Sequence, residues 1–548
     1  MVSIIVAPPA SGSRLIVRHL RPHVLVDQQV LIEALSNPAL YPHAARRVQV
    51  IETHISWVLL VNHQAYKIKK AVDLGFLDFS ELQARKFYCE EEIRLNRRFA
   101  PALYEDVICI GGTLHRPMLG RKPAIEYAVR MHRFDGDKLM DRMLDRNEVT
   151  PAHIDALADA VAAFHIALPP ADMTAVYGKP STIRAPILQN FEQLLSLMSD
   201  GERDLAPLRQ RSEAEYAACE AVFAERRQQG WVRECHGDLH LGNIVVIGSV
   251  PVPFDGIEFN PSFRWIDVMN EVAFLTMDLL YRNRADLAFR FLNRYLETTG
   301  DYRSVRVLRF YLAYRAVVRA KILAIRAHQH SLKAHETAEA MAGCHLHLAL
   351  AELCLTRKRP LLILMHGLPA CGKTTVAQAA LERLQAFRIR SDVERKRLFG
   401  LAPLESSHSR PGDDIYSPEA TRRTYERLYE LSRESLAAGF PVIVDAAFLK
   451  RAERDQFRAL ADELAVPFAI LSVQAREATL RERIQRRMAE MNDASEANLD
   501  VLETLRTVHE PLTEKERARA VEFVNDDGVG EIGASAVWDR LEKKLLSR

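Results

Sequence analysis

A glycine-rich loop ending in lysine and threonine constrains the fold of this chain more than any other feature. It follows the apolar run 361–365 and precedes a segment with helical periodicity, Thr375–Leu384. Such a loop lets backbone N–H groups and the start of a helix surround a phosphate, which requires glycine at close approaches. The sequence therefore predicts a strand, a phosphate-binding loop and a helix, with nucleotide contacts from Gly367, Gly372, Lys373, Thr374 and Thr375.

The last 190 residues alternate between short apolar runs and helical segments. Regular alternation of this kind is typical of a parallel sheet with helices on both faces. The basic stretch 357–360 lies where this alternating pattern begins, so we predict an α/β domain over 358–548. Its expected strands are 361–366, 387–391, 441–445, 468–473 and 521–525.

Two polar clusters follow strands of this predicted sheet. Asp445 ends the run 441–445, where an acid can position a metal ion or water. The segment Arg390-Ser-Asp392-Val-Glu-Arg395 resembles the acceptor-activating S-x-D-x-x-R element of polynucleotide 5′-hydroxyl kinases and related small-molecule P-loop kinases. That resemblance implies that Asp392 takes the acceptor proton and Arg395 holds an acceptor or a phosphate. The alternative is a helix N-cap followed by a surface arginine.

An arginine-rich segment, 476–487, follows the fourth predicted strand. Phosphoryl transfer spreads negative charge over the transferred group, so a kinase of this type needs cations above it. Arg483 and Arg487 are four residues apart and would share one helix face, which predicts a lid that contacts ATP. The alternative is a solvated helix face.

A second set of residues suited to phosphoryl transfer lies about 130 residues earlier. In His236-Gly-Asp238-Leu-His240-Leu-Gly-Asn243, an aspartate and an asparagine are five residues apart, and Asp255 ends the following apolar run. This spacing is typical of kinases in which one acid orients the acceptor hydroxyl and the other two residues bind metal. We therefore expect Asp238 to be catalytic, with Asn243 and Asp255 as Mg²⁺ ligands.

The segment Cys235–Ile244 resembles the catalytic loop of the aminoglycoside phosphotransferase family, a small-molecule branch of the protein-kinase-like fold. The resemblance implies the same roles: Asp238 as catalytic base, and Asn243 and Asp255 as metal ligands. Gly237 stands where protein kinases have arginine, and Gly256-Ile257 follows the second aspartate instead of Phe-Gly. These departures favour a small-molecule kinase over a protein kinase.

The lysine that contacts ATP should lie on an early strand. Lys67 and Lys69 share a face because side chains alternate along a strand, and we prefer Lys67. Lys69 and Lys70 could equally be solvated. The carboxylate partner is expected among Glu90, Glu91 and Glu92, with Glu92 preferred, and the backbone of 127–131 is expected to meet adenine.

The first part of the chain predicts an α+β domain of protein-kinase-like type over 25–357, preceded by a loose arm, 1–24. Short strand-like runs between 48 and 69 indicate an antiparallel meander, followed by a helix over 79–99. Gly111-Gly112 is expected to form a turn between strands at 107–110 and 124–132. Helical periodicity prevails beyond Pro151, and Asp267 is expected to begin a helix.

Composition narrows the partners and the compartment. A formal net charge of +2 over 548 residues carries no overall signal for nucleic acid or membrane. The seven cysteines form no C-x-x-C pair, which argues against a disulfide framework or a structural zinc site. The first ten residues lack a basic start, and no run of about 18 apolar residues occurs. We expect a cytoplasmic protein without membrane contact.

The order of the two regions resembles bacterial proteins described as an aminoglycoside phosphotransferase domain fused to an ATP-binding kinase domain. The resemblance implies a bifunctional kinase that uses ATP and Mg²⁺ to phosphorylate hydroxyls of small-molecule acceptors. Two alternatives remain open. One domain could be an ATP-binding regulatory module, or the C-terminal domain could be a 5′-hydroxyl nucleic-acid kinase.

Overall fold

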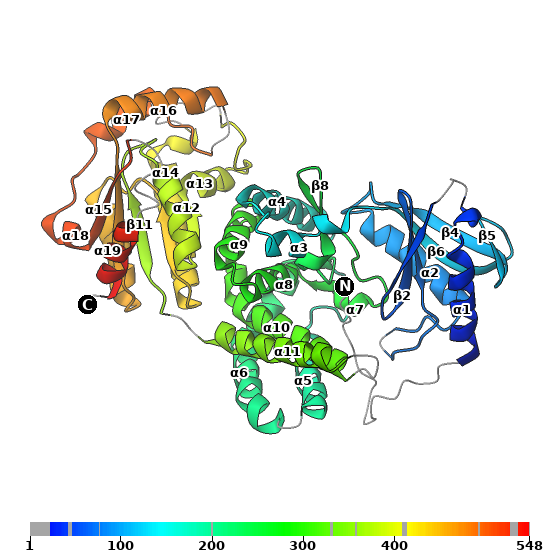
Figure 1. Cartoon of the computed structure of the whole chain (residues 1–548). Coiled ribbons are helices and arrows are strands. Elements are labelled where there is room, and N and C mark those ends of the chain that lie inside the picture. The colour runs from blue at the N-terminus through cyan, green and yellow to red at the C-terminus, as the bar shows by residue number, and fades with distance from the viewer. Residues whose placement is uncertain are drawn as a thin grey trace. The chain divides into compact units, whose positions relative to one another are not determined.

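The computed structural model describes residues 22–41, 46–75, 77–198, 201–328, 333–356, 359–407, 414–490, 494–526 and 535–546. The chain forms two compact units (Figure 1): unit 1 contains 1–282 and 307–355, and unit 2 contains 283–306 and 356–548. The arm predicted at 1–24 lies outside the described residues up to residue 21. A helix, α1 (Pro22–Leu35), begins at Pro22, so residues 22–24, which the sequence assigns to the arm, are helical.

Unit 1 begins with an antiparallel sheet of six strands in the order β1-β2-β3-β6-β4-β5. Side chains of β3 alternate between its faces: Tyr66 and Ile68 pack on the side of α1, and Ala65 packs on the side of α2 (Leu82–Asn96). The predicted meander is confirmed. The strands are β1 (Val48–Glu52), β2 (Ser56–Val61), β3 (Gln64–Lys69), β4 (Tyr104–Thr113), β5 (Arg116–Leu119) and β6 (Ala124–His132).

The turn predicted at Gly111-Gly112 is wrong, because both glycines lie in β4, which continues to Thr113 and pairs with β5. Glycine is needed there for a close approach between backbones. A Cβ on Gly111 would lie 2.2 Å from the carbonyl oxygen of Arg121. Glycines that permit such an approach and glycines that permit a turn look alike in a sequence.

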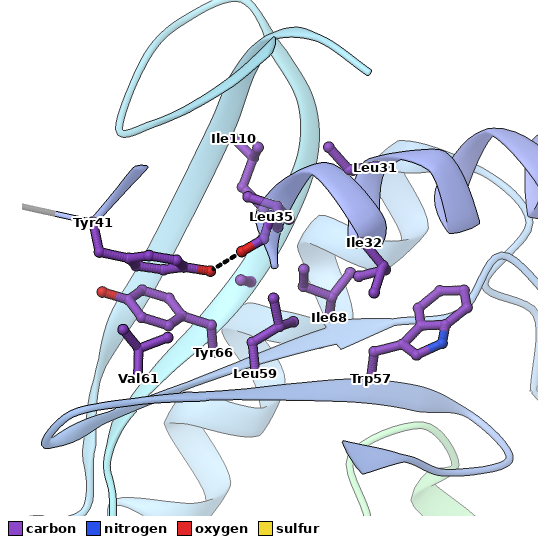
Figure 2. Close-up of a cluster of buried hydrophobic side chains, with 11 residues drawn as sticks. Leu31, Ile32, Leu35, Tyr41, Trp57, Leu59, Val61, Tyr66, Ile68 and Ile110 are labelled. Atoms are coloured by element: carbon purple, nitrogen blue, oxygen red, sulfur yellow. Dashed lines mark hydrogen bonds between the residues drawn. The ribbon is translucent and has the colours of Figure 1, made fainter. Parts of the chain in front are cut away.

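Figure 2 shows the apolar cluster that attaches α1 to the sheet. Leu31, Ile32 and Leu35 of the helix pack against Trp57 and Leu59 of β2, and all five side chains are buried. The Tyr41 hydroxyl donates a hydrogen bond of 2.8 Å to the carbonyl oxygen of Leu35. This packing covers one face of the sheet, so the opposite face, with α2, remains for the site described below.

The rest of unit 1 is mainly helical, as the sequence predicts beyond Pro151. Thr150 caps α4 with a capping box, which fixes its start. Two short antiparallel pairs, β7 with β10 and β8 with β9, interrupt the helices. The elements are α3 (Met140–Asp145), α4 (Pro151–Ala167), α5 (Pro180–Leu197), α6 (Gly201–Gln228), β7 (Val232–Glu234), β8 (Ile244–Ile247), β9 (Val250–Pro253), α7 (Pro261–Arg264), β10 (Trp265–Asp267), α8 (Val268–Tyr281), α10 (Val305–Ala327) and α11 (Ala334–Leu355).

Unit 2 contains a five-stranded parallel sheet in the order β12-β13-β11-β14-β15, with helices on both sides (Figure 1). The predicted parallel sheet is confirmed. Its strands are β11 (Leu362–His366), β12 (Phe387–Arg390), β13 (Val442–Asp445), β14 (Phe468–Gln474) and β15 (Ala520–Val524). The helices after the glycine-rich loop are α12 (Lys373–Leu384), α13 (Ser391–Leu398), α14 (Pro418–Ala437), α15 (Arg451–Glu463), α16 (Glu477–Glu490), α17 (Leu499–Thr507), α18 (Glu514–Arg519) and α19 (Ser535–Leu546).

A segment that precedes the glycine-rich loop in sequence also belongs to unit 2. It contains α9 (Ala285–Thr299), which lies within the range that the sequence assigns to the first domain. The Asn293 side chain donates a hydrogen bond of 2.9 Å to the carbonyl oxygen of Ala386 and accepts one of 2.6 Å from the backbone N–H of Arg388. These bonds attach α9 to the start of β12.

Candidate functional site

The predicted catalytic loop of unit 1 brings Asp238 and Asn243 together. The loop lies between β7 and β8, and both side chains are buried. The amide nitrogen of Asn243 donates hydrogen bonds to the Asp238 carboxylate, at 2.9 Å from Oδ2, and to its backbone carbonyl, at 3.0 Å. A spacing of five residues therefore folds the amide back onto the acid, and the amide oxygen remains as the atom that can ligate a cation.

The second carboxylate oxygen of Asp238 has no hydrogen-bond partner among the described residues, although it is buried. Burial raises the pKa of this carboxyl, but the nearby His240 and Arg319 outweigh burial and lower it below its ordinary value. The group is therefore ionised at neutral pH. An ionised, buried oxygen without a donor is suited to accept a proton or a hydrogen bond from a hydroxyl group.

Lys67, Glu92 and Asp255 meet on the α2 side of the sheet. The Lys67 ammonium lies 2.8 Å from Glu92 Oε1 and 2.5 Å from Asp255 Oδ1. Burial lowers the pKa of Lys67, but Asp255 and Glu92 outweigh burial and raise it well above its ordinary value. The other two glutamates considered for this role pair elsewhere on α2, Glu90 with Lys86 and Glu91 with Arg94.

The idea that Lys69 and Lys70 are solvated is wrong, since both are buried. The Lys69 ammonium lies 2.7 Å from Glu92 Oε2 and also contacts Glu258. Burial lowers the pKa of Lys69, but the carboxylates of Glu258 and Glu92 outweigh it and raise the pKa. Lys67 is the lysine of this pair that contacts Asp255, whereas Lys69 contacts Glu258.

The position of Asp255 suits a metal ligand. Its backbone φ is +63°, a left-handed conformation that aspartate tolerates better than most residues. Its N–H donates a hydrogen bond of 3.0 Å to the Tyr104 hydroxyl. Asp255 and Asn243 offer carboxylate and amide oxygens, the hard ligands that Mg²⁺ prefers, so the residues present fit a magnesium ion.

The backbone of 127–131 is not available to meet adenine, and that expectation is wrong. These residues lie in β6, where 128–131 pair with β3 on one side and with β4 on the other. In a central strand, the backbone N–H and C=O groups bond to both neighbouring strands. A nucleotide base must therefore find its backbone partners outside this stretch.

Two carboxylates of α8 anchor the catalytic loop, and the sequence did not identify them. Glu271 accepts hydrogen bonds from the backbone N–H groups of His236, at 3.1 Å, and Gly237, at 2.6 Å. Asp278 accepts one of 2.9 Å from the N–H of Leu241. His165 lies 3.0 Å from Glu271 and helps to keep the pKa of that buried carboxyl low against the opposing effect of burial. Both ends of the loop are thus fixed by buried acids.

Replacing Glu271 by glutamine is expected to destabilise unit 1. One amide oxygen cannot serve two N–H donors and a histidine as a carboxylate does, so buried donors lose their partner. Breaking one side of a buried charged network costs about 3 to 5 kcal/mol. The temperature at which unit 1 unfolds should fall, whereas the exposed Glu192→Gln should leave it unchanged. Equal temperatures for both variants would contradict the anchoring role.

Asp267 begins α8, as the sequence predicts. Its side chain accepts a hydrogen bond of 2.9 Å from the N–H of Met269, and it forms a buried ion pair with Arg226 at 2.7 Å. The carboxylate therefore caps the helix that carries both anchoring acids.

The glycine-rich loop of unit 2 joins β11 to α12 in the conformation that a phosphate-binding loop requires. Gly367 has φ +143° and Gly372 has φ +98°. A Cβ at Gly367 would lie 2.3 Å from the carbonyl oxygen of Val473, and one at Gly372 would lie 2.0 Å from the Asn525 amide. The loop therefore tolerates only glycine at positions 367 and 372. The Lys373 ammonium donates hydrogen bonds of 2.9 and 2.8 Å to the carbonyl oxygens of Gly367 and Leu368.

A cavity of about 840 Å³ lies beside this loop. It is large enough for a nucleotide and a small acceptor together, since ligand pockets commonly measure about 300 to 1,000 Å³. All but one of the residues that the sequence assigns to the second site contribute to its wall. These residues are Gly372, Lys373, Thr374, Thr375, Asp392, Arg395, Asp445, Arg483 and Arg487.

The part of the cavity that contains Asp392 combines acids with a buried arginine. Arg395 donates hydrogen bonds from Nη1 to the carbonyl oxygen of Ile415 (2.7 Å) and the Thr421 hydroxyl (3.2 Å), while its Nε has no hydrogen-bond partner among the described residues. Asp445 Oδ2 likewise has no hydrogen-bond partner there. The Arg395 N–H suits an oxygen of an acceptor or a phosphate, and the Asp445 oxygen suits a metal ion, so the residues present fit Mg²⁺ at Asp445 as well.

The arginines of α16 divide between the cavity and the outer surface. Arg483 lies 3.4 Å from the carbonyl oxygen of Ala370 in the glycine-rich loop, and Arg487 donates a hydrogen bond of 2.7 Å to the carbonyl oxygen of Ala497. Both line the cavity. Arg481 instead pairs with Glu477 and Glu503. The spacing of four residues therefore places Arg483 and Arg487 on one face, as predicted.

Comparisons with known proteins agree with this architecture. The AAA domain family matches residues 362–512. The uncharacterized protein Rv2004c of Mycobacterium tuberculosis (strain ATCC 25618 / H37Rv) is 28% identical over 464 residues, which are 84% of this chain and 89% of that protein. Both units are kinase-like. The glycine-rich loop, the parallel sheet and the family match agree with a P-loop nucleotide-binding fold for unit 2. The sheet, the lysine pair and the loop with Asp238 and Asn243 agree with a protein-kinase-like fold for unit 1.

Solved structures of kinases resemble each part of the chain. The amicoumacin kinase hAmiN, in complex with AMP-PNP, Ca²⁺ and Ami, is 11% identical and covers 61% of this chain and 96% of its own, with a TM-score of 0.39. A gluconokinase from Sinorhizobium meliloti 1021 is 21% identical and covers 34% of this chain and 91% of its own, with a TM-score of 0.23. Among the helices that the structure describes, none has the length and apolar character needed to cross a membrane.

Proposed function

We propose that the chain is a bifunctional ATP-dependent phosphotransferase that moves the γ-phosphoryl group of ATP to hydroxyls of small-molecule acceptors, with one active site in each unit. The observation that carries the proposal is the cavity of unit 2, whose wall joins the phosphate-binding loop to Asp392, Arg395 and Asp445. A nucleotide and an acceptor can therefore be held together at the carboxyl ends of the strands, which is the arrangement that in-line transfer needs.

In unit 1, Asp238 orients the acceptor hydroxyl and receives its proton at the buried carboxylate oxygen that has no hydrogen-bond partner among the described residues. Lys67, held by Glu92, contacts the phosphates of ATP. Asn243 and Asp255 hold Mg²⁺, which neutralises charge on the phosphates when it is bound. Low-dielectric surroundings strengthen each of these interactions, because Asp238 and Asn243 are buried.

In unit 2, the backbone of the glycine-rich loop and Lys373 bind the phosphates of ATP, and Thr374 and Asp445 hold Mg²⁺. Asp392 takes the proton of the acceptor and Arg395 holds the acceptor. Arg483 and Arg487 approach the transferred phosphoryl group from α16. Seven free thiols suit the reducing cytoplasm, where we place both reactions.

A second candidate function concerns unit 2 alone, as a kinase of nucleic-acid 5′-hydroxyl ends. The observation that favours it is the number of arginines in the cavity wall, namely Arg390, Arg395, Arg483, Arg486 and Arg487. Contacts of arginine with a nucleic-acid backbone make binding strongly salt-dependent. Tight binding of oligonucleotides that weakens steeply with salt would favour this candidate over a small-molecule acceptor.

Phosphorylated products test the proposal directly. The full chain is incubated with ATP, Mg²⁺ and sugars, amino alcohols, aminoglycosides or 5′-hydroxyl oligonucleotides, and products are identified by mass. We expect at least one small acceptor to gain a phosphoryl group, and Asp238→Asn or Lys373→Ala to abolish that product. The alternative in which one unit regulates the other would be supported by a different result. Both units would then bind ATP, no acceptor would gain a phosphoryl group, and neither substitution would change the ATP turnover.

A further inference from the structure

Glu297 of α9 holds two arginines that belong to the edge of the unit 2 site. Its carboxylate is buried, and Oε1 accepts hydrogen bonds from Arg388 Nε at 2.9 Å and Nη2 at 2.6 Å. Oε2 lies 3.8 Å from Nη1 of Arg390. Arg388 and Arg390 are two residues apart on β12, so they share one face of the strand, and a single acid can reach both.

Each arginine also lies near a residue of the proposed unit 2 site. Arg388 Nη1 lies 3.4 Å from the backbone carbonyl oxygen of Thr374 in the phosphate-binding segment. Arg390 Nε lies 3.7 Å from Asp445 Oδ2, and both Arg390 and Asp445 line the cavity. Glu297 is therefore connected through Arg388 to the phosphate-binding segment, and through Arg390 to the acid suited to Mg²⁺.

The charges of Glu297, Arg390 and Asp445 affect how readily the Asp445 carboxylate can bind a cation. Arg390 lies between two carboxylates, Glu297 and Asp445, and no hydrogen bond fixes Asp445 Oδ2 among the described residues. Without the charge of Glu297, the Arg390 guanidinium would lose one carboxylate neighbour and would be attracted more strongly to Asp445. A closer pair of that kind would compete with Mg²⁺ for the same oxygen, because interactions between charges are strong where water is excluded.

We propose that Glu297 is a positioning residue of the unit 2 site: by sharing Arg390 it keeps the Asp445 carboxylate available to Mg²⁺·ATP. This inference rests on the proposed function of unit 2. It also assigns part of that site to a helix that precedes the phosphate-binding loop in the sequence, within the range expected to form the first kinase domain.

Magnesium dependence of nucleotide binding tests this role without relying on turnover. The full chain carries Asp255→Asn, which removes a metal ligand of unit 1, and binding of a non-hydrolysable ATP analogue is measured against Mg²⁺ concentration. Glu297→Gln should raise the Mg²⁺ concentration for half-maximal binding roughly 10-fold, as loss of a residue that orients a metal ligand commonly does. Adding Arg390→Gln should return the Mg²⁺ requirement toward the starting value, since it removes the competing charge.

A matched control separates positioning from packing. Glu382 on α12 pairs with Arg290 of the same helix α9, at 2.9 Å. Glu382→Gln therefore weakens the attachment of α9 without reaching Arg390, and it should leave the Mg²⁺ requirement unchanged.

The inference is overturned if Glu297→Gln and Glu382→Gln both lower the melting temperature and neither shifts the Mg²⁺ requirement. It is also overturned if the shift persists in the double variant. Failure of the proposed function has a different signature: Lys373→Ala would then bind the analogue as tightly as the unsubstituted chain, which removes the basis of the inference as well.

Discussion

Replacing Asp238 by asparagine is expected to lower the ATP turnover of unit 1 by about 100- to 10,000-fold, the range that a positioned acid or base contributes. Asparagine has the same shape but cannot accept the acceptor proton. The buried oxygen to which no described residue donates a hydrogen bond would become an amide atom without basicity. The rate is measured in a chain that also carries Lys373→Ala, so that unit 2 does not contribute.

Binding and rate should respond differently to this substitution. Because Lys67, Glu92 and Asp255 form a separate cluster, affinity of unit 1 for ATP should change little. The control is Asp172→Asn, an exposed acid outside the catalytic loop, which should retain the full rate. Retention of turnover by Asp238→Asn, with an acceptor bound, would mean that this carboxylate is not the base.

Replacing Lys373 by alanine is expected to lower the turnover of unit 2 by about 100- to 1,000-fold, as loss of one group that stabilises developing charge does in other enzymes. Its ammonium donates to two carbonyl oxygens of its own loop, so it already lies within reach of the position that a phosphate would take. Turnover is measured in the Asp238→Asn background, where unit 1 is inactive.

A residue on the same helix provides the comparison for Lys373. Arg383 lies near the end of α12, is largely exposed and pairs with Glu542 at 3.4 Å. Arg383→Gln should keep both nucleotide affinity and rate, because it removes a positive charge from α12 without changing the phosphate-binding loop. Similar losses in both variants would attribute the effect to the net charge of unit 2 instead of to Lys373.

Features that depend on short stretches of sequence could be predicted well. Four of the five strands of unit 2 are mainly apolar runs, β12 alternates apolar residues with arginine, and a parallel sheet follows from the alternation of strands with helices. The spacing of Asp238 and Asn243 is local too, and it brings their side chains together. Period-two alternation placed Lys67 and Lys69 on one face, although it could not tell that both are buried.

Features that depend on distant residues could not be predicted. Glu271 and Asp278 look like ordinary helix acids, and their role appears only when α8 packs beside a loop more than thirty residues earlier in the chain. The burial of Lys69 could not be predicted either, because its partners Glu92 and Glu258 come from separate elements. The strand β6 was assigned a nucleotide contact because its central place in the sheet cannot be seen from its sequence.

The position of α9 has a consequence for biosynthesis. The ribosome completes α9 before it makes α12 and β12, the elements to which Asn293, Arg290 and Glu297 attach. About 75 residues separate the end of α9 from the start of α12. Because translation proceeds at about 5 to 20 residues per second, α12 is synthesised about 4 to 15 seconds after α9. During that interval Phe289 lacks the contact that it makes with Phe387 of β12 in the folded protein. The nascent chain therefore cannot finish its folding in the order in which its residues are made.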